Sequence, residues 1–209
     1  MRSLPLEHLR VACKTRVMGS SGYRIAALDE STWPAFAELV ECNNGVFGGC
    51  WCMGFHPQGD PADAEFATKR ERKENRVATD RAHAALVFDG DRCLGWVQFG
   101  RPDEVPRIKN RKEYEKGLEA PPDWQIVCHF VGKGHRRKGV ASAGLAGALD
   151  LIAELGGGTV EGYPEPADAV PAGFLYHGAL STYESLGFVR DRQIGKHRWV
   201  VSKVVKRKR

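Results

Sequence analysis

Residues 126–142, with the sequence IVCHFVGKGHRRKGVAS, form the most informative stretch of the chain. The pattern predicts a buried strand over Ile126–Val131, a glycine-rich turn with consecutive basic residues, and then a helix. Glycine lets a backbone turn tightly and approach a ligand closely. The amides that open a helix lack internal partners and lie at the positive end of its dipole. The stretch therefore predicts a site for a phosphate or pyrophosphate group.

Two common nucleotide-binding motifs do not fit this turn. In a P-loop, a lysine and a serine or threonine are required where Val140 and Ala141 stand. In the dinucleotide fingerprint, a third glycine is required where Arg137 stands. Taken alone, the turn is also compatible with a basic surface loop that precedes a helix.

The elements expected around this stretch alternate between strands and helices. Leu145, Leu149 and Ile152 recur at helical spacing after the turn, and Gly156–Gly158 end that helix. Asp89-Gly90-Asp91 between two apolar runs predicts a hairpin, which makes an α/β fold with a mixed sheet. In chain order, we expect strands at 23–28, 84–88, 93–99, 126–131, 159–163, 188–189 and 199–205. We expect one helix that begins at 29–32 and ends near 43, a second over 62–79, a third that follows the glycine-rich turn and ends at 155, and a fourth over roughly 176–186.

The composition is that of one globular domain. The chain has 209 residues, of which 42% are apolar and 27% are charged, which argues against extensive disorder. No apolar run approaches the ~18 residues of a membrane span, and the basic N-terminus lacks the apolar core of a signal peptide. We therefore expect a soluble cytoplasmic protein that has no membrane partner.

The net charge of +5 is concentrated at the two ends of the sequence. Residues 1–22 hold four basic residues against one acidic residue, and residues 196–209 hold seven basic residues and no acidic one. A nucleic-acid-binding domain is expected to carry its basic face on the fold itself. The distribution therefore argues against a nucleic-acid partner, and Lys206–Arg209 is more simply interpreted as a solvated tail.

The six cysteines show no metal-binding spacing. Cys50-Trp51-Cys52 is a single close pair with His56 four residues later, whereas a zinc site usually has two Cys-x-x-Cys pairs. We expect no metal and reduced thiols, as is usual in a cytoplasmic protein. Neither Cys50 nor Cys52 is expected to be a nucleophile, because the sequence shows no supporting histidine and acid beside them. The cysteines lie at 13, 42, 50, 52, 93 and 128.

Two motifs in register resemble those of one enzyme family. Residues 131–141, Val-x4-Arg-x2-Gly-x-Ala, are similar to the acetyl-CoA signature of the GCN5-related N-acetyltransferases (GNAT). Residues 183–188, YESLGF, resemble the second hallmark of that family, a helix that ends in Tyr-x-x-x-Gly-Phe. A helix, a strand and a helix are expected between the two motifs, as in the family. The Gly-Cys-Trp-Cys-Met sequence at 49–53 also resembles a subgroup of these proteins.

The resemblance implies a GNAT-like fold and a place for its co-substrate. The sheet would be mostly antiparallel, flanked by helices and splayed between the fourth and fifth strands, here 126–131 and 159–163. Residues 1–22 would be an N-terminal extension, 23–205 the acetyltransferase domain and 206–209 a basic tail. The pantetheine arm of acetyl-CoA would contact the backbone of His129, Phe130 and Val131. Its pyrophosphate would be held by the turn and the helix start, which comprise Arg136, Arg137, Lys138, Gly139, Val140, Ala141 and Ser142.

The resemblance also implies a chemistry. The protein would be an N-acetyltransferase, in which a primary amine of a small molecule, peptide or protein attacks acetyl-CoA directly in a ternary complex. Tyr183 matches the general acid of the family, and its alternative interpretation is a core aromatic. Gln125 stands where many relatives carry a glutamate base, and glutamine cannot accept a proton. The candidates to replace it are Asp123, His129, Glu161 and His177, the last expected at a helix start facing solvent, or no side-chain base at all.

The acceptor pocket of the family would come from 43–60 and 101–123. Trp51, Phe55 and His56 could contact the acceptor, although a hydrophobic plug under the loop explains them equally well. Because Gln125 replaces the glutamate, a CoA-binding sensor or an inactive relative is the alternative function. Many relatives form homodimers, and the sequence specifies neither an interface nor the identity of the amine acceptor.

Overall fold

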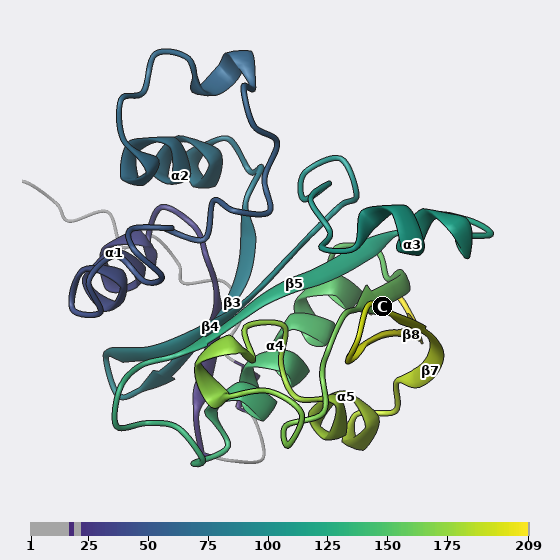
Figure 1. The fold of residues 1–209 in the computed structure, drawn as a ribbon. Coiled ribbons are helices and arrows are strands. Elements are labelled where there is room, and N and C mark those ends of the chain that lie inside the picture. Colours follow the sequence, from purple (N-terminus) through teal and green to yellow (C-terminus); the bar gives the residue numbers. More distant parts are fainter. Residues whose placement is uncertain (1–16, 19–21, 209) are drawn as a thin grey trace, which may run out of the picture.

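A mixed eight-stranded sheet forms the centre of the computed structural model, which describes residues 17–18 and 22–208 (Figure 1). The strand order is β1-β2-β3-β4-β5-β6-β8-β7, and every neighbouring pair is antiparallel except β5 and β6. The expected fold class is therefore confirmed. The strands are β1 Val17–Met18, β2 Arg24–Ala27, β3 His83–Asp89, β4 Arg92–Gly100, β5 Trp124–Val131, β6 Gly158–Gly162, β7 Val189–Ile194 and β8 Arg198–Val205.

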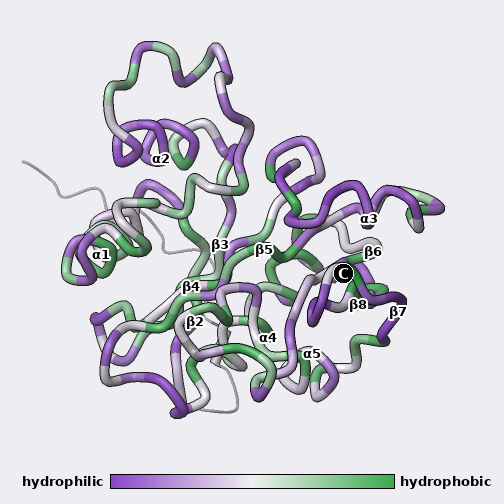
Figure 2. Tube along the Cα trace, viewed as in Figure 1, coloured by the Kyte–Doolittle hydropathy of each residue, from purple (hydrophilic) through white to green (hydrophobic). Residues whose placement is uncertain are grey.

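Helices cover both faces of the sheet. Helices α1 and α2 lie on one face, and α4 and α5 lie on the other (Figure 1). Figure 2 shows the contrast between the hydrophilic α2 and the more apolar α4, which packs over the middle of the sheet. The helices are α1 Trp33–Glu41, α2 Lys69–Ala78, α3 Arg111–Lys116, α4 Val140–Glu154 and α5 Leu180–Ser185, with short 3-10 turns at η1 Pro61–Asp63 and η2 Ala172–Phe174.

Helix α4 packs closely against the sheet, and this packing holds its first turn in place at the site. Leu145, Leu149 and Ile152 are buried, as their spacing predicted. Gly147 allows the helix to approach β2, because an added Cβ would lie 2.4 Å from Cγ2 of Ile25. Any larger residue at that position would push α4 away from the sheet.

A bulge and a gap in the sheet expose part of β5. Gln98 pairs with Cys128 and Phe99 pairs with Ile126, so Val127 has no partner on β4 and forms a β-bulge. On its other side, β5 pairs with β6 only over Trp124–Ile126. The remaining segment, Val127–Val131, diverges from β6, and this is the splay that the family resemblance implied. The backbone groups of β5 that face the gap are left without a strand partner.

Two expected helix starts and one expected solvent exposure differ from the structure. The helix expected over 62–79 begins only at Lys69, because Thr68 forms a capping box with Glu71. The helix expected over 176–186 begins at Leu180, because Gly178 has a φ of +85°. The expectation that His177 faces solvent was wrong, since only 1% of this residue is exposed.

The two ends of the chain are described only in part. Most of the expected extension 1–22 lies outside the described residues, although Val17–Met18 pair with β2 at the sheet edge. Arg209 of the expected basic tail also lies outside them, and Lys208 pairs with Glu154 of α4 at 2.7 Å. Among the described residues, no helix has both the length and the apolar character needed to cross a bilayer.

Candidate active site

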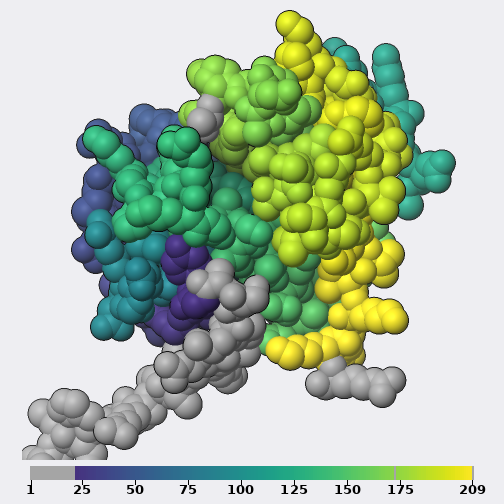
Figure 3. Space-filling model, turned by 90° about the horizontal axis from the view of Figure 1, so that it is seen from below, coloured from purple at the N-terminus to yellow at the C-terminus, as the bar shows by residue number. Residues whose placement is uncertain are grey.

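The first cavity of the site, the splay cavity, has a volume of about 320 Å³ and opens beside the splayed end of β5. In Figure 3, which views the molecule from below, the yellow and yellow-green C-terminal part covers most of the right side, and purple to green earlier segments cover the left side. Of the residues expected to bind the co-substrate, all except Lys138 line the cavity. The lining comprises His129, Phe130, Val131, His135, Arg136, Arg137, Gly139, Val140, Ala141 and Ser142, with Phe47, Gly173, Leu175, Tyr176, Gly178, Ala179 and Thr182 from other segments.

The start of α4 presents backbone amides to the splay cavity. Gly139 is the N-cap residue with a φ of +80°, and because it has no side chain it forms no capping hydrogen bond to the first turn of the helix. The free amides and the helix dipole favour an anion at this place. Arg136 and Arg137 are exposed and add positive charge. Lys138 instead turns its backbone carbonyl to the hydroxyl of Tyr23, which donates to it at 2.9 Å.

Only some residues of β5 turn their backbone groups toward the gap between β5 and β6. The amide of His129 points into the gap and donates to the carbonyl of Tyr176 at 2.6 Å. Phe130 turns its carbonyl toward β4, where a Cβ on Gly95 would lie 2.4 Å from it. Because backbone groups alternate in direction along a strand, Val131 faces the same side as His129. Of the three residues expected to offer backbone groups, Phe130 therefore does not present its carbonyl to the gap.

Tyr183 and His129 form a buried pair at the wall of the splay cavity. The Tyr183 hydroxyl lies 2.9 Å from Nε2 of His129, and both side chains are buried. Burial raises the pKa of Tyr183 well above its ordinary value and lowers the pKa of His129 to about 3. At neutral pH, the tyrosine is thus protonated and the imidazole is neutral. His129 lines the cavity, whereas Tyr183 lies behind it with its ring against Gly162 and Gly178.

A second, larger cavity adjoins the first. This loop cavity has a volume of about 600 Å³ and lies between the 46–55 loop, the 107–109 loop and the 174–177 segment. Phe47 and Tyr176 line both cavities, and their rings meet edge to face with centroids 5.9 Å apart. The lining comprises Val46, Phe47, Cys50, Cys52, Gly54, Phe55, Trp96, Arg107, Ile108, Lys109, Cys128, Phe174, Tyr176 and His177.

Only one of the three residues expected to contact the acceptor lines the loop cavity. Phe55 does so, and its ring packs against His177 at 5.3 Å. Trp51 instead stacks on Trp33 with centroids 6.0 Å apart, in the core beneath the loop. The hydrophobic plug that was the alternative interpretation therefore describes Trp51.

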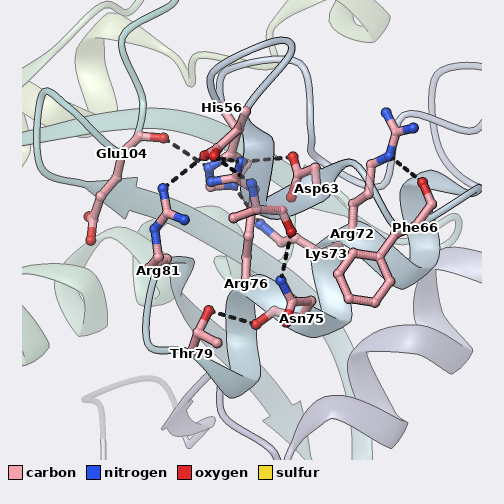
Figure 4. A network of polar contacts seen from close by, with 12 residues as sticks. His56, Asp63, Phe66, Arg72, Lys73, Asn75, Arg76, Thr79, Arg81 and Glu104 are labelled. Atoms are coloured by element: carbon pink, nitrogen blue, oxygen red, sulfur yellow. Dashed lines mark hydrogen bonds and ion pairs between the residues drawn. The ribbon is translucent and has the colours of Figure 1, made fainter.

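His56 belongs to a buried polar network with Lys73 of α2 and the carbonyl of Glu104 (Figure 4). Its Nδ1 lies 2.9 Å from the carbonyl of Glu104, and its Nε2 lies 3.1 Å from the Lys73 amine. The Lys73 amine also donates to Oε1 of Gln98 at 3.2 Å. Burial lowers the pKa of both His56 and Lys73. His56 is 1% exposed and already hydrogen-bonded, and it is not part of the lining of the loop cavity.

A second part of this network joins α2 to the loop before it. The buried Arg76 donates to Asp60 and to Asp63, at 2.8 Å in each case, and Arg81 donates to Asp60 at 2.8 Å (Figure 4). The Ala62 amide and these guanidinium groups hold the pKa of Asp60 at about 2. The pairs fix the 45–68 segment against α2 and so position one wall of the loop cavity.

Residues 50–188 match the family model described as "Acetyltransferase (GNAT) family". The chain belongs to this family. No curated protein matches the sequence. The Gly-Cys-Trp-Cys-Met subgroup is not resolved by these matches.

Solved GNAT structures share the fold at low sequence identity. The GNAT domain of PAT from S. lividans aligns with a TM-score of 0.54 and 13% identity, over 91% of this chain and 96% of that one. The ribosomal-protein-S5-alanine acetyltransferase from Vibrio fischeri aligns with a TM-score of 0.52 and 13% identity, over 91% and 97%. RimL, a ribosomal L7/L12 alpha-N-protein acetyltransferase in complex with coenzyme A, aligns with a TM-score of 0.50 and 13% identity, over 92% and 98%.

The GNAT protein is an acyltransferase, and acetyl-CoA is its co-substrate. The splay cavity fits this group, because it combines backbone groups of a splayed strand with a glycine turn, a helix start and exposed arginines. Pyrophosphate needs such amides and positive charge, and a pantetheine arm needs strand-like backbone partners.

The candidate bases of this GNAT protein lie in different surroundings. Gln125 is buried and pairs in register with Glu161 on β6. Glu161 accepts hydrogen bonds from Tyr114 at 2.7 Å and from Tyr163 at 3.1 Å, and burial raises its pKa. Asp123 accepts from the Thr159 amide at 2.7 Å and so holds the start of β6. Neither carboxylate lines either cavity.

His177 is the candidate base that lines the loop cavity. Its ring packs on Tyr176 with centroids 4.6 Å apart, and both ring nitrogens are buried without a hydrogen-bond partner among the described residues. Burial, followed by the nearby charge of Arg198, lowers its pKa well below the ordinary value, so the imidazole is neutral at neutral pH. Tyr176 and His177 were not expected to form cavity walls. In the sequence, Gly178 was the one indication that the helix expected over 176–186 would begin only after these two residues.

Cysteines also line the loop cavity. Cys50, Cys52 and Cys128 all do so, and all are free thiols. Burial alone would raise the pKa of Cys52, but its contact with Cys128 and the nearby Lys73 amine lower it. Among the described residues, no group of three or more His, Cys, Asp or Glu is arranged to hold a metal ion.

Proposed function

We propose that the protein is an N-acetyltransferase that moves the acetyl group of acetyl-CoA to a primary amine by direct attack in a ternary complex. The observation that carries this proposal is the junction of the two cavities at Phe47 and Tyr176. One cavity fits the co-substrate and the other offers an apolar space to an acceptor. Holding both reactants side by side supplies most of the rate enhancement that such a reaction needs. The names of two solved relatives, which are acetyltransferases of ribosomal proteins, support acetyl transfer to an amine.

Tyr183 and His129 are the proposed proton source for the leaving thiolate. Tyr183 lies behind His129, so it would donate its proton to Nε2 of the imidazole while Nδ1 releases its own proton to the leaving thiolate. The high pKa of the tyrosine keeps it protonated at neutral pH, and the low pKa of the histidine keeps it free to relay the proton. If the two residues act as one unit, Tyr183→Phe, His129→Phe and the double variant should lower kcat by the same factor. Multiplied losses in the double variant would show two independent roles.

His177 is the proposed acceptor of the proton that the amine releases. It is neutral, buried and part of the loop cavity wall, whereas Glu161 is bonded to two tyrosines outside both cavities. His177→Gln should lower kcat about tenfold or more and change the pH dependence of kcat. Glu161→Gln is the matched control and should leave the pH profile in place. If Glu161→Gln lowered kcat and changed its pH dependence while His177→Gln did not, Glu161 would be the proton acceptor.

The test of the proposed function is amine-dependent release of the CoA thiol. A panel of primary amines is incubated with acetyl-CoA and the protein, and the free thiol is measured with a chromogenic disulfide. Turnover that depends on both the amine and the protein, with the acetylated amine seen by mass spectrometry, supports the proposal. Tight binding of acetyl-CoA without turnover on any amine would instead support the alternative function, a CoA-binding sensor. The observation that favours the alternative is Gln125 in the place of the expected glutamate.

A further inference from the structure

We infer that the acceptor is a small primary amine on an apolar, ring-sized body that also carries a carboxylate. This inference names the substrate class of the loop cavity and rests on the proposed function. The carboxylate is expected at the mouth of the cavity beside Arg107 and Lys109, and the amine at the inner end beside Tyr176.

The charges around the loop cavity are of one sign. Arg107 and Lys109 are exposed and are the charged residues of its lining. In the described part of the chain, the lining includes no aspartate or glutamate. Near Cys52 and Cys128 of the lining, the Lys73 amine is buried and hydrogen-bonded to the uncharged His56 and Gln98. An acceptor with a second positive charge would meet repulsion here, whereas an anion would be attracted.

The pKa of His177 is affected by positive charges near the cavity. Besides burial, the charges of Arg198 and Lys109 contribute to the low pKa of its imidazole. Arg198 is buried and paired with Glu165 at 3.1 Å, so its charge is already balanced. Lys109 lines both the loop cavity and a neighbouring groove and forms no ion pair among the described residues. It is therefore free to pair with a ligand carboxylate.

The remaining wall is apolar and aromatic. Phe55, Trp96, Ile108, Phe174 and Tyr176 all contribute to it. A volume of about 600 Å³ is in the range of pockets that enclose small molecules. Flat aromatic walls gain most from an aromatic or cyclic body. The reactive amine must reach the splay cavity, and Tyr176 and Phe47 mark the place where the two spaces join.

Three ligands of the same shape and different charge test the inference. The probes are 4-(aminomethyl)benzoate, 4-(aminomethyl)benzamide and 1,4-bis(aminomethyl)benzene, which place an anion, a neutral group or a cation opposite the same amine. Binding is measured with CoA present by the fluorescence of the tryptophans, because Trp96 lines the cavity. Initial rates with acetyl-CoA give kcat/KM for the same compounds. We expect the benzoate to bind at least about fivefold more tightly than the benzamide, and the diamine to bind most weakly.

Charge reversal at the mouth should invert this order. In the variant with Arg107→Glu and Lys109→Glu, we expect the diamine to bind best and the benzoate worst. The control carries Lys69→Glu and Lys116→Glu, which change the net charge equally at exposed positions outside the cavity lining. The control should keep the original order.

The outcomes separate the inference from the proposed function. Equal binding of the three probes, preference for the diamine, or no binding of any probe would overturn the inference. Acetyl transfer to other amines would then leave the proposed function standing. Failure of the protein to bind acetyl-CoA would remove the proposed function, while the fluorescence order of the three probes would still report on the charge of the cavity.

Discussion

The splay cavity and the loop cavity adjoin each other but are built in different ways. The splay cavity takes most of its lining from one continuous stretch, 129–142, and presents backbone groups of a strand end and a helix start. The loop cavity collects side chains from loops that are far apart in sequence, together with Trp96 and Cys128 of the sheet. Backbone groups are shared by all sequences of the fold and suit a constant co-substrate. Loop side chains vary readily and suit an acceptor that differs between relatives.

The largest expected effect comes from a change confined to the splay cavity. Gly139→Asp forces a non-glycine residue to a φ of +80° and places a carboxylate where the pyrophosphate is expected. We expect the Kd for acetyl-CoA, measured by calorimetry, to rise about a thousandfold. Gly90→Asp, at the β3–β4 turn with a φ of +57°, is a control matched in strain and charge. Equal losses in both variants would mean that the start of α4 is not the anion site.

The second largest expected effect is on kcat, and it comes from Tyr183, which lies between the splay cavity and the core. Tyr183→Phe keeps the ring packed against Gly162 and Gly178 and removes only the hydroxyl that contacts His129. We expect kcat to fall about a hundredfold while the Kd for acetyl-CoA stays unchanged. Steady-state rates and calorimetry on the same protein check both values. A parallel loss of affinity and rate would make Tyr183 a packing residue rather than a proton source.

Each cavity has a buried histidine, and acid should destabilise the protein through them. The pKa of His129 is about 3 when folded, below its ordinary 6.5, so folding favours the neutral form. Its contribution is complete above pH ~6.5 and is lost as the pH falls from there toward 3. By pH 5, His129 alone should lower the free energy of unfolding by about 2 kcal/mol. Urea unfolding at pH 7.5 and pH 5 checks this loss, which should be smaller in His129→Gln. An equal loss in both proteins would contradict the assignment.

The smallest effect tests the junction itself. Phe47 is 57% exposed, so Phe47→Ala should change stability little, but its ring lines both cavities. We expect the KM values for acetyl-CoA and for the acceptor each to rise about threefold. Phe174→Ala is the matched control, because Phe174 is similarly exposed and lines the loop cavity but not the splay cavity. It should raise the acceptor KM alone. The same pattern in both variants would show that the two cavities do not meet at Phe47.

The sequence predicted the splay cavity because the signals there are local. Three glycines, a basic run and a helix with Leu145, Leu149 and Ile152 on one face lie within one stretch, and backbone geometry follows from them directly. The residues that were expected to bind the co-substrate lie together in the lining of this cavity, and Lys138 is the exception. The orientation of Phe130 was missed, because backbone groups alternate along a strand and the bulge at Val127, which has no signature in the sequence, determines which of them face the gap.

The loop cavity could be predicted only in outline. The 43–60 and 101–123 segments were expected to form it, but periodicity does not distinguish Phe55, which lines it, from Trp51, which packs in the core. His177 was misplaced because local pattern extended the helix across Gly178. The neighbour of Gln125 is Glu161, which lies 36 residues away in sequence, and only the parallel pairing of β5 with β6 brings the two together. Contacts of this kind depend on tertiary packing.

The most direct test of the account is a calorimetric titration of the wild-type protein with acetyl-CoA, CoA and NADH. The two-cavity account predicts micromolar binding of acetyl-CoA and CoA at one site and no binding of NADH, because the turn lacks the third glycine of a dinucleotide site. The absence of heat with both CoA compounds would contradict the assignment of the splay cavity. The proposed reaction would then have no co-substrate site, and the shared fold alone would not support it.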